Sequence, residues 1–149
     1  MRTKKLIGGL GGVVLALAVV VWLAAPSAEA QKTKGKTRAA EMKFLMRGVC
    51  QPNCAALGKL LKDGPADDKA WETALCHASI LNEFGYVLMD DGRCPDKDWA
   101  AAAKTLRECS LKVVEATRAK DKAAAEAAFK KLTSSCSACH SVHKVKKTN

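Results

Sequence analysis

Apolar residues recur at helical spacing along most of the chain, in four runs that polar or turn-forming segments separate. The runs cover about residues 37–62, 68–89, 98–118 and 122 onward. No segment shows the period-two alternation that is typical of a half-buried strand. Four helices joined by short loops predict an all-α fold, an antiparallel up-down four-helix bundle.

Proline and glycine divide the pattern into these elements. Pro52 interrupts the first run and is expected to kink the helix or to remove one of its hydrogen bonds. The segment Lys62-Asp63-Gly64-Pro65 predicts the end of that helix, and Gly92 and Pro95 mark a loop over residues 90–97. Aspartates stand where the second and third helices begin and can cap them: Asp67 or Asp68, and Asp96 or Asp98.

The fourth run places two cysteines on the face that it buries. Phe129, Leu132, Cys136 and Cys139 lie at i, i+3, i+7 and i+10, which is one continuous seam of a helix. In an up-down bundle the end of the fourth helix lies beside the start of the first, and the loop over 90–97 is at the same end. The chemistry of these cysteines is therefore expected at that end, with His140 on the same side.

The N-terminus has the pattern of a secretory signal peptide. Arg2, Lys4 and Lys5 precede an apolar run over residues 6–25, and the small-x-small sequence Ala28-Glu29-Ala30 follows as a cleavage site. The run is nearly long enough to span a bilayer, so an uncleaved N-terminal anchor is the alternative. The predicted domains are a cleaved signal peptide (1–30), a disordered start (31–36), a bundle (37–144) and a basic tail (145–149) of an exported, periplasmic protein.

The chain is basic, with much of the excess near the ends of the predicted mature protein. Lys and Arg number 25 and Asp and Glu 15, for a formal charge of +10, and cleavage after Ala30 leaves +8 because it removes three basic residues and one acidic residue. Terminal lysines are most often solvated tails. Export argues against nucleic acid as a partner, so the functional alternative is steering toward another redox protein with an acidic docking surface.

The strongest chemical signal is Cys136-Ser137-Ala138-Cys139-His140, a C-x-x-C-H sequence. This is the attachment signature of haem c, in which two thiols bind the vinyl groups along one porphyrin edge and the next imidazole binds iron. Cys136 and Cys139 are the predicted thioether residues of one covalent haem, and His140 is its proximal axial ligand. A redox dithiol usually accompanies a βαβ pattern, and a structural zinc site requires a second ligand pair; this chain has neither.

With these residues the chain resembles the class II c-type cytochromes, the cytochrome c′ family, over residues 37–144. Residues 128–132 leading into the C-x-x-C-H sequence are similar to the last helix of that family, and Trp99 opens an alanine-rich segment that also fits. Near the front, residues 38–43 are similar to the family's R-x-x-x-M-K stretch. The resemblance implies a four-helix bundle that carries haem c at the end of its last helix.

The resemblance also implies a role for Met42. In low-spin members a methionine at this place is the second axial ligand, whereas in five-coordinate members the equivalent side chain only crowds the distal face. Met42 is therefore expected to be the distal ligand, with an ordinary core methionine as the alternative. Met46, one turn later, is a second candidate, and Met89 is expected in the core. His143 shares a helix end with His140 and is not expected to reach the opposite face of the haem.

The other five cysteines do not belong to the family pattern: Cys50, Cys54, Cys76, Cys94 and Cys109. Cysteines of exported proteins tend to oxidise, and counting from the turns puts four of these near one level of the bundle. Two disulfides, buried free thiols, a metal cluster with His77 and a second haem at Cys76-His77 are all open alternatives.

Two functions of different classes follow from these residues. With His140 and Met42 as axial ligands, the chain is expected to be a one-electron carrier, because such ligands raise the reduction potential and close the iron to other ligands. Without the methionine bond, the resemblance implies a binding protein for nitric oxide or carbon monoxide. No acid–base group is expected over the distal face, so no enzyme activity is predicted. Family members often form homodimers through their first two helices, which the sequence leaves open here.

Overall fold

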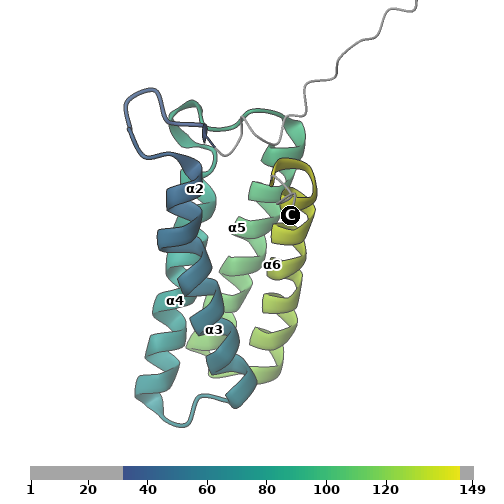
Figure 1. The fold of residues 1–149 in the computed structure, drawn as a ribbon. Helices are drawn as coiled ribbons and strands as arrows, with labels where there is room; N and C mark the ends of the chain where they lie inside the picture. Colours follow the sequence, from purple (N-terminus) through teal and green to yellow (C-terminus); the bar gives the residue numbers. More distant parts are fainter. Residues whose placement is uncertain (1–31, 145–149) are drawn as a thin grey trace, which may run out of the picture.

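The computed structural model describes residues 32–144, and within that range all regular elements are helical, with no strand. The first column consists of α2 (Met42–Leu45), the π-helical η1 (Met46–Cys50) and α3 (Gln51–Asp63). The other three columns are α4 (Asp68–Val87), α5 (Lys97–Arg118) and α6 (Lys122–His143), and a short 3-10 turn, η2 (Asp90–Gly92), follows α4. Figure 1 shows consecutive columns running in opposite directions, so the predicted all-α bundle is confirmed.

Three of the four columns begin at an aspartate whose carboxylate caps the helix. Asp67 accepts a hydrogen bond from the backbone N–H of Ala70 at 2.8 Å, and Asp96 accepts one from Trp99 at 2.9 Å. Asp121 does the same for α6, with the N–H of Ala124 at 2.9 Å. Each cap satisfies one of the N–H groups that the first turn leaves without a helical partner. The sequence therefore located these helix starts within a residue or two.

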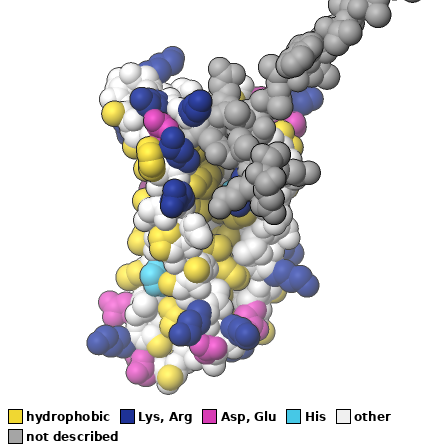
Figure 2. All heavy atoms as spheres, viewed as in Figure 1, with side chains coloured by type: hydrophobic (Ala, Val, Ile, Leu, Met, Phe, Trp, Pro, Cys, Tyr) yellow, Lys and Arg dark blue, Asp and Glu magenta, His cyan; other side chains and the backbone are white. Residues whose placement is uncertain are grey.

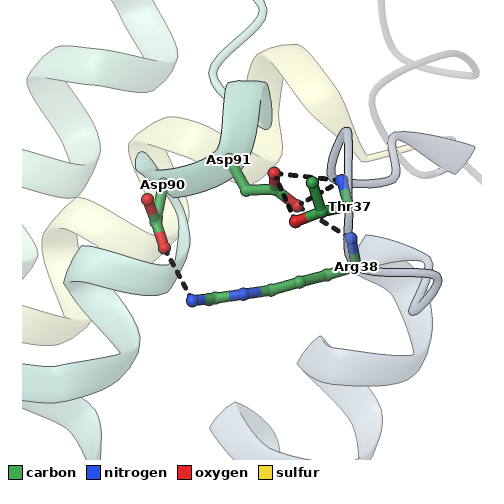
Figure 3. Close-up of polar contacts among 4 residues, drawn as sticks. All are labelled: Thr37, Arg38, Asp90 and Asp91. Atoms are coloured by element: carbon green, nitrogen blue, oxygen red, sulfur yellow. Dashed lines mark hydrogen bonds and ion pairs between the residues drawn. The ribbon is translucent and has the colours of Figure 1, made fainter.

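The first column begins later than its sequence predicts, at Met42 instead of residue 37. The backbone N–H groups of Thr37 and Arg38 donate to the carboxylate of Asp91 at 3.0–3.1 Å, and the Thr37 hydroxyl adds a further bond at 3.0 Å (Figure 3). The N–H of Lys36 donates to the Asp91 carbonyl at 2.8 Å. Hydrogen bonds to the α4–α5 loop thus take the place of the first helical turn that was predicted at residue 37. They also include Lys36, which belongs to the segment predicted to be disordered.

Pro52 does not break the first column but is preceded by a π-helical segment. Proline has no N–H group, so the carbonyl four residues before it lacks its usual helical partner. A π-helix shifts the pairing by one residue, which lets the chain pass this position without ending the helix. The amide of Asn53 also donates to the carbonyl of Val49 at 2.7 Å. At the far end the predicted stop is confirmed, because Gly64 has a φ of 82°, a left-handed conformation that favours glycine.

The core runs along the whole bundle and includes nearly all of the predicted apolar face. Leu57, Leu81, Val113 and Leu132 are completely buried, and Trp99 is 3% exposed. Some apolar residues that follow the helical period lie instead at the surface, since Phe44 is 57% exposed and Ile80 41%. Within the described range no helix is long and apolar enough to cross a membrane; the predicted signal peptide and basic tail lie outside that range.

The four columns are not equally close along their length. α5 packs against both α4 and α6, and α3 packs against α4 and, near its end, against α6. In contrast, no Cα atom of α2 or η1 lies within 8 Å of a Cα atom of α6. Figure 2 shows hydrophobic side chains along the seam between the first column and α6. The bundle is thus tightest at its lower end in Figure 1 and wider where α6 ends.

Candidate functional site

The C-x-x-C-H sequence forms the last turns of α6, at the same end of the bundle as α2 and the α4–α5 loop (Figure 1). Cys136 and Cys139 are half-buried and pack against the hydrophobic core, on the seam that also contains Leu132. This confirms the predicted face of the two thiols. His140 is not on that face: it lies one residue further around the helix and is exposed in this structure. The expectation that it shares the buried side is therefore wrong for this conformation.

Both thiols are held in their neutral form. Burial raises the pKa of Cys139 to about 11, and neighbouring Cys136 and Asp96 add to the effect. Burial, with the nearby Cys54, also raises the pKa of Cys136. A reactive dithiol has the opposite property, a lowered pKa that is often provided by a helix N-terminus, whereas these cysteines lie at a helix C-terminus. The surroundings therefore disfavour a redox dithiol and suit cysteines that are buried as uncharged groups.

The imidazole of His140 is neutral at pH 7. Partial burial of the ring lowers its pKa from 6.5, and the charge of Lys144 lowers it further. Part of the ring is thus desolvated although the residue as a whole is exposed. A neutral imidazole is the form that binds a metal, so His140 is ready to act as a ligand without first losing a proton.

Met42 lies inside the bundle at this end, as the first residue of α2. Its side chain is 2% exposed and belongs to the same hydrophobic cluster as the half-buried Cys136 and Cys139. Its backbone N–H donates to the carbonyl of Thr33 at 3.0 Å, which fixes the start of the helix. Met46 and Met89 are only half-buried, so Met42 is the methionine that this end of the core encloses.

A second histidine, His143, is buried at this end of the bundle, which the sequence pattern did not indicate. His143 is 3% exposed, and its ring packs edge-on against Trp99 with a centroid distance of 5.3 Å. Its Nε2 lies 3.5 Å from a carboxylate oxygen of Asp96, and neither ring nitrogen has a hydrogen-bond partner among the described residues. The Trp99 indole N–H, in contrast, donates to the carbonyl of Leu88 at 2.8 Å. His143 thus packs as an aromatic ring against Trp99 at the end of α6.

The α4–α5 loop also buries a charge that the sequence pattern did not indicate. Arg93 is 1% exposed, and its Nε and Nη1 atoms have no hydrogen-bond partner within the part of the chain that the structure describes. An arginine in a loop between an aspartate pair and a proline is typical of a surface residue, so no sequence signal identified it.

Among residues 32–144 the other cysteines do not form a metal cluster with His77, which was one of the alternatives that the sequence left open. All seven cysteines are free thiols in this structure, and no group of three or more metal-ligating side chains occurs within residues 32–144. Cys76 is exposed, and the Nδ1 of His77 lies 2.8 Å from the side-chain oxygen of Asn53. Cys50 and Cys54 lie close enough to Cys136 to interact with it electrostatically, and burial raises the pKa of Cys50 to about 12.

One end of the bundle therefore brings together two neutral thiols, a neutral imidazole, a buried thioether and the buried side chains of Arg93 and His143, four nitrogens of which lack a hydrogen-bond partner within residues 32–144. No protein-family model, curated protein or solved structure matches the chain. The sequence motif and the geometry of this end are therefore the features that indicate a function.

Proposed function

We propose that the chain is a c-type cytochrome, similar to the cytochrome c′ family, and that it carries single electrons between other redox proteins. The observation that carries this proposal is the common location of the C-x-x-C-H sequence and Met42. The two cysteines on the core side of α6 and the one methionine that the described residues enclose lie at the same end of the bundle.

The surroundings fit a haem at this end. Cys136 and Cys139 point toward the core as neutral thiols, which is the state in which they can become thioethers. No Cα atom of α2 or η1 lies within 8 Å of a Cα atom of α6, so these two columns meet through apolar side chains and thiols, the surroundings that a flat apolar group requires. The Nε and Nη1 atoms of Arg93 and both ring nitrogens of His143 at this end have no hydrogen-bond partner within residues 32–144. These features support one covalent haem c as the cofactor.

In this proposal each residue has a distinct role. Cys136 and Cys139 tether the group to α6, and His140 binds iron from the proximal side as a neutral imidazole. Met42 supplies a thioether from the opposite column and excludes water and other ligands from the metal. The bound group supplies reversible one-electron chemistry at iron. Glu41 is held by Lys43 at 2.7 Å, so it does not offer a free acid–base group beside Met42.

The basic side chains suggest how a partner approaches. Lys32, Lys34, Lys36 and Arg38 are exposed in the segment before α2, and Figure 2 shows Lys and Arg side chains gathered over that side of the molecule. A cationic rim around the electron-transfer end steers an acidic redox protein toward it and increases the association rate at low salt. We place this exchange in the periplasm, on the strength of the predicted signal peptide.

The test is a mass and a spectrum of the full chain expressed with periplasmic haem attachment. We expect a coloured protein whose mass exceeds that of residues 31–149 by one haem and whose Cys136 and Cys139 resist alkylation. The ferric spectrum is expected to be low-spin, without uptake of carbon monoxide. A high-spin protein that binds carbon monoxide would support the gas-binding alternative, and a colourless protein with both thiols reactive would refute the cytochrome proposal.

A further inference from the structure

Arg93 is the largest side chain that the described part of the bundle encloses completely. It follows η2 in the loop between α4 and α5, and its Nε and Nη1 atoms have no hydrogen-bond partner among residues 32–144. A guanidinium remains charged at any physiological pH, so burial without an anionic partner is costly. Such a residue calls for an explanation, because buried charges in proteins are normally paired.

The acidic residues of the same loop do not pair with it. The carboxylate of Asp91 receives the N–H groups of Thr37 and Arg38 as well as the Thr37 hydroxyl. Asp90 binds the exposed guanidinium of Arg38 at 3.0 Å (Figure 3). The remaining acid, Asp96, caps α5 and faces His143. Arg93 influences Asp91 electrostatically, but no carboxylate forms an ion pair with it in the described residues.

The backbone before α2 closes over the guanidinium from outside. A Cβ atom at Gly35 would lie 3.1 Å from Arg93 Nη2 and would collide with the Asp91 carboxylate, so this close approach requires glycine. Beyond Gly35 the chain leads to Met42, and on the other side the loop leads to Asp96, beside His143 and Cys139. Arg93 therefore lies in the loop at the same end of the bundle as the two segments that carry the proposed iron ligands (Figure 1).

We propose that Arg93 is the binding residue for a propionate carboxylate of the haem. This inference depends on the proposed function and adds a ligand contact to it. Guanidinium and carboxylate match as a planar pair with two parallel hydrogen bonds, donated by Nη2 together with either Nε or Nη1, so one propionate would satisfy one of the two orphaned nitrogens in this way. The pair would keep the propionate ionised, and the arginine charge would favour the reduced iron by offsetting its electron.

The experiment measures the reduction potential of the haem-loaded full chain as a function of pH. In Arg93→Gln we expect a lower potential than in the wild type, together with an apparent pKa of the haem-linked ionisation that is raised by at least about one unit. Arg93→Lys keeps the charge but offers no planar pair, so its pKa is expected to lie between the other two. Arg38→Gln is the matched control, because it removes one positive charge from the same end but from an exposed ion pair.

The outcomes separate this inference from the proposed function. A coloured Arg93→Gln protein with the wild-type pH profile would refute propionate binding and leave the cytochrome proposal intact. Equal shifts in Arg93→Gln and Arg38→Gln would also refute it, since they would reflect net charge alone. If Arg93→Gln does not accumulate, Arg93→Lys decides the question. A raised pKa of the haem-linked ionisation in Arg93→Lys would support propionate binding, and an unchanged pKa would refute it. A colourless wild type would refute the cytochrome proposal and, with it, this inference.

Discussion

Met42 is the single side chain on which the choice between electron carrier and gas binder depends. It is 2% exposed at the N-terminal end of the first column, so replacing it removes both a thioether and a filled volume. In Met42→Ala we expect the ferric spectrum of the loaded protein to change from low-spin to high-spin, the potential to fall and carbon monoxide to bind. Optical and electron-resonance spectra with and without carbon monoxide measure this.

The half-buried Met46, one turn along the same column, provides the control. Met46→Ala is expected to keep the wild-type spectrum. If Met42→Ala also keeps it, another group occupies the distal position and the ligand assignment fails.

Asp91 predicts a pH dependence of stability. Desolvation tends to raise its pKa, but the hydrogen bonds from Thr37 and Arg38 and the charge of Arg93 outweigh it, so the pKa lies below 3.8. A lowered folded-state pKa stabilises the protein at neutral pH, and this contribution disappears as the pH falls through that pKa. We therefore expect Asp91→Ala to lower the urea midpoint clearly at pH 7 and much less at the lowest pH at which the fold persists.

The neighbouring Asp90 is the comparison for this measurement. Its ion pair with Arg38 is 55% exposed on both sides, so Asp90→Ala is expected to change the midpoint little. If the urea midpoints of the wild type and Asp91→Ala differ by the same amount at every pH, the charge of the Asp91 carboxylate is not the cause of the stabilisation.

At the scale of elements, α6 stabilises the fold mainly through one buried stripe of side chains. Leu132 is completely buried on the seam that continues to Cys136 and Cys139, whereas Leu111 on α5 is 48% exposed. Leu132→Ala is expected to lower the free energy of unfolding by about 3 kcal/mol, because it removes buried surface and leaves a cavity. Leu111→Ala should stay within about 0.5 kcal/mol of the wild type in the same urea titration. Similar losses of unfolding free energy in both variants would contradict the proposed importance of this buried seam.

The sequence predicted those features of the elements that local rules determine. Helix type followed from the 3.6-residue period, and Asp67 and Asp96, each one of two aspartates expected at its helix start, capped α4 and α5. The seam of Cys136 and Cys139 followed from the same period. These predictions succeeded because each depends on residues that are close together in the chain.

The features that sequence reasoning missed depend on residues that are far apart in the chain. The first column starts late because Asp91, 54 residues after Thr37, binds the backbone that would have formed the first turn. The burial of Arg93 and His143 is also a product of segments that meet only in the folded bundle. The period did place His140 near the cysteines, but a single residue's offset turned it toward solvent.

For the whole molecule, the uneven spacing of the columns predicts which part the proposed haem would stabilise. η1 packs against α4, but neither α2 nor η1 has a backbone neighbour in α6, while α4, α5 and α6 pack along their length. In Cys136→Ala/Cys139→Ala, which cannot attach haem, we expect the amides of residues 42–50 to exchange faster than in the loaded protein. Those in the middle of α5 should retain most of their protection, because that helix packs on two neighbours. Hydrogen-exchange mass spectrometry provides the measurement.

The exposed Cys76 serves as the control for this experiment, since Cys76→Ala removes a thiol but leaves both attachment residues. Its exchange pattern is expected to match the wild type. Uniform loss of protection in the double variant, including α5, would show that the haem supports the entire bundle and not one end of it.

The π-helical turn at Met46–Cys50 has a consequence for the direction in which Met42 points. Such a turn amounts to one extra residue inserted into an α-helix, and it rotates everything on its N-terminal side by about 100° relative to a regular helix. If this segment closed into a regular α-helix with no residue lost, Lys43 would move to the azimuth that Met42 now holds. A lysine ammonium would then face the interior, so the wide turn is what directs the methionine inward.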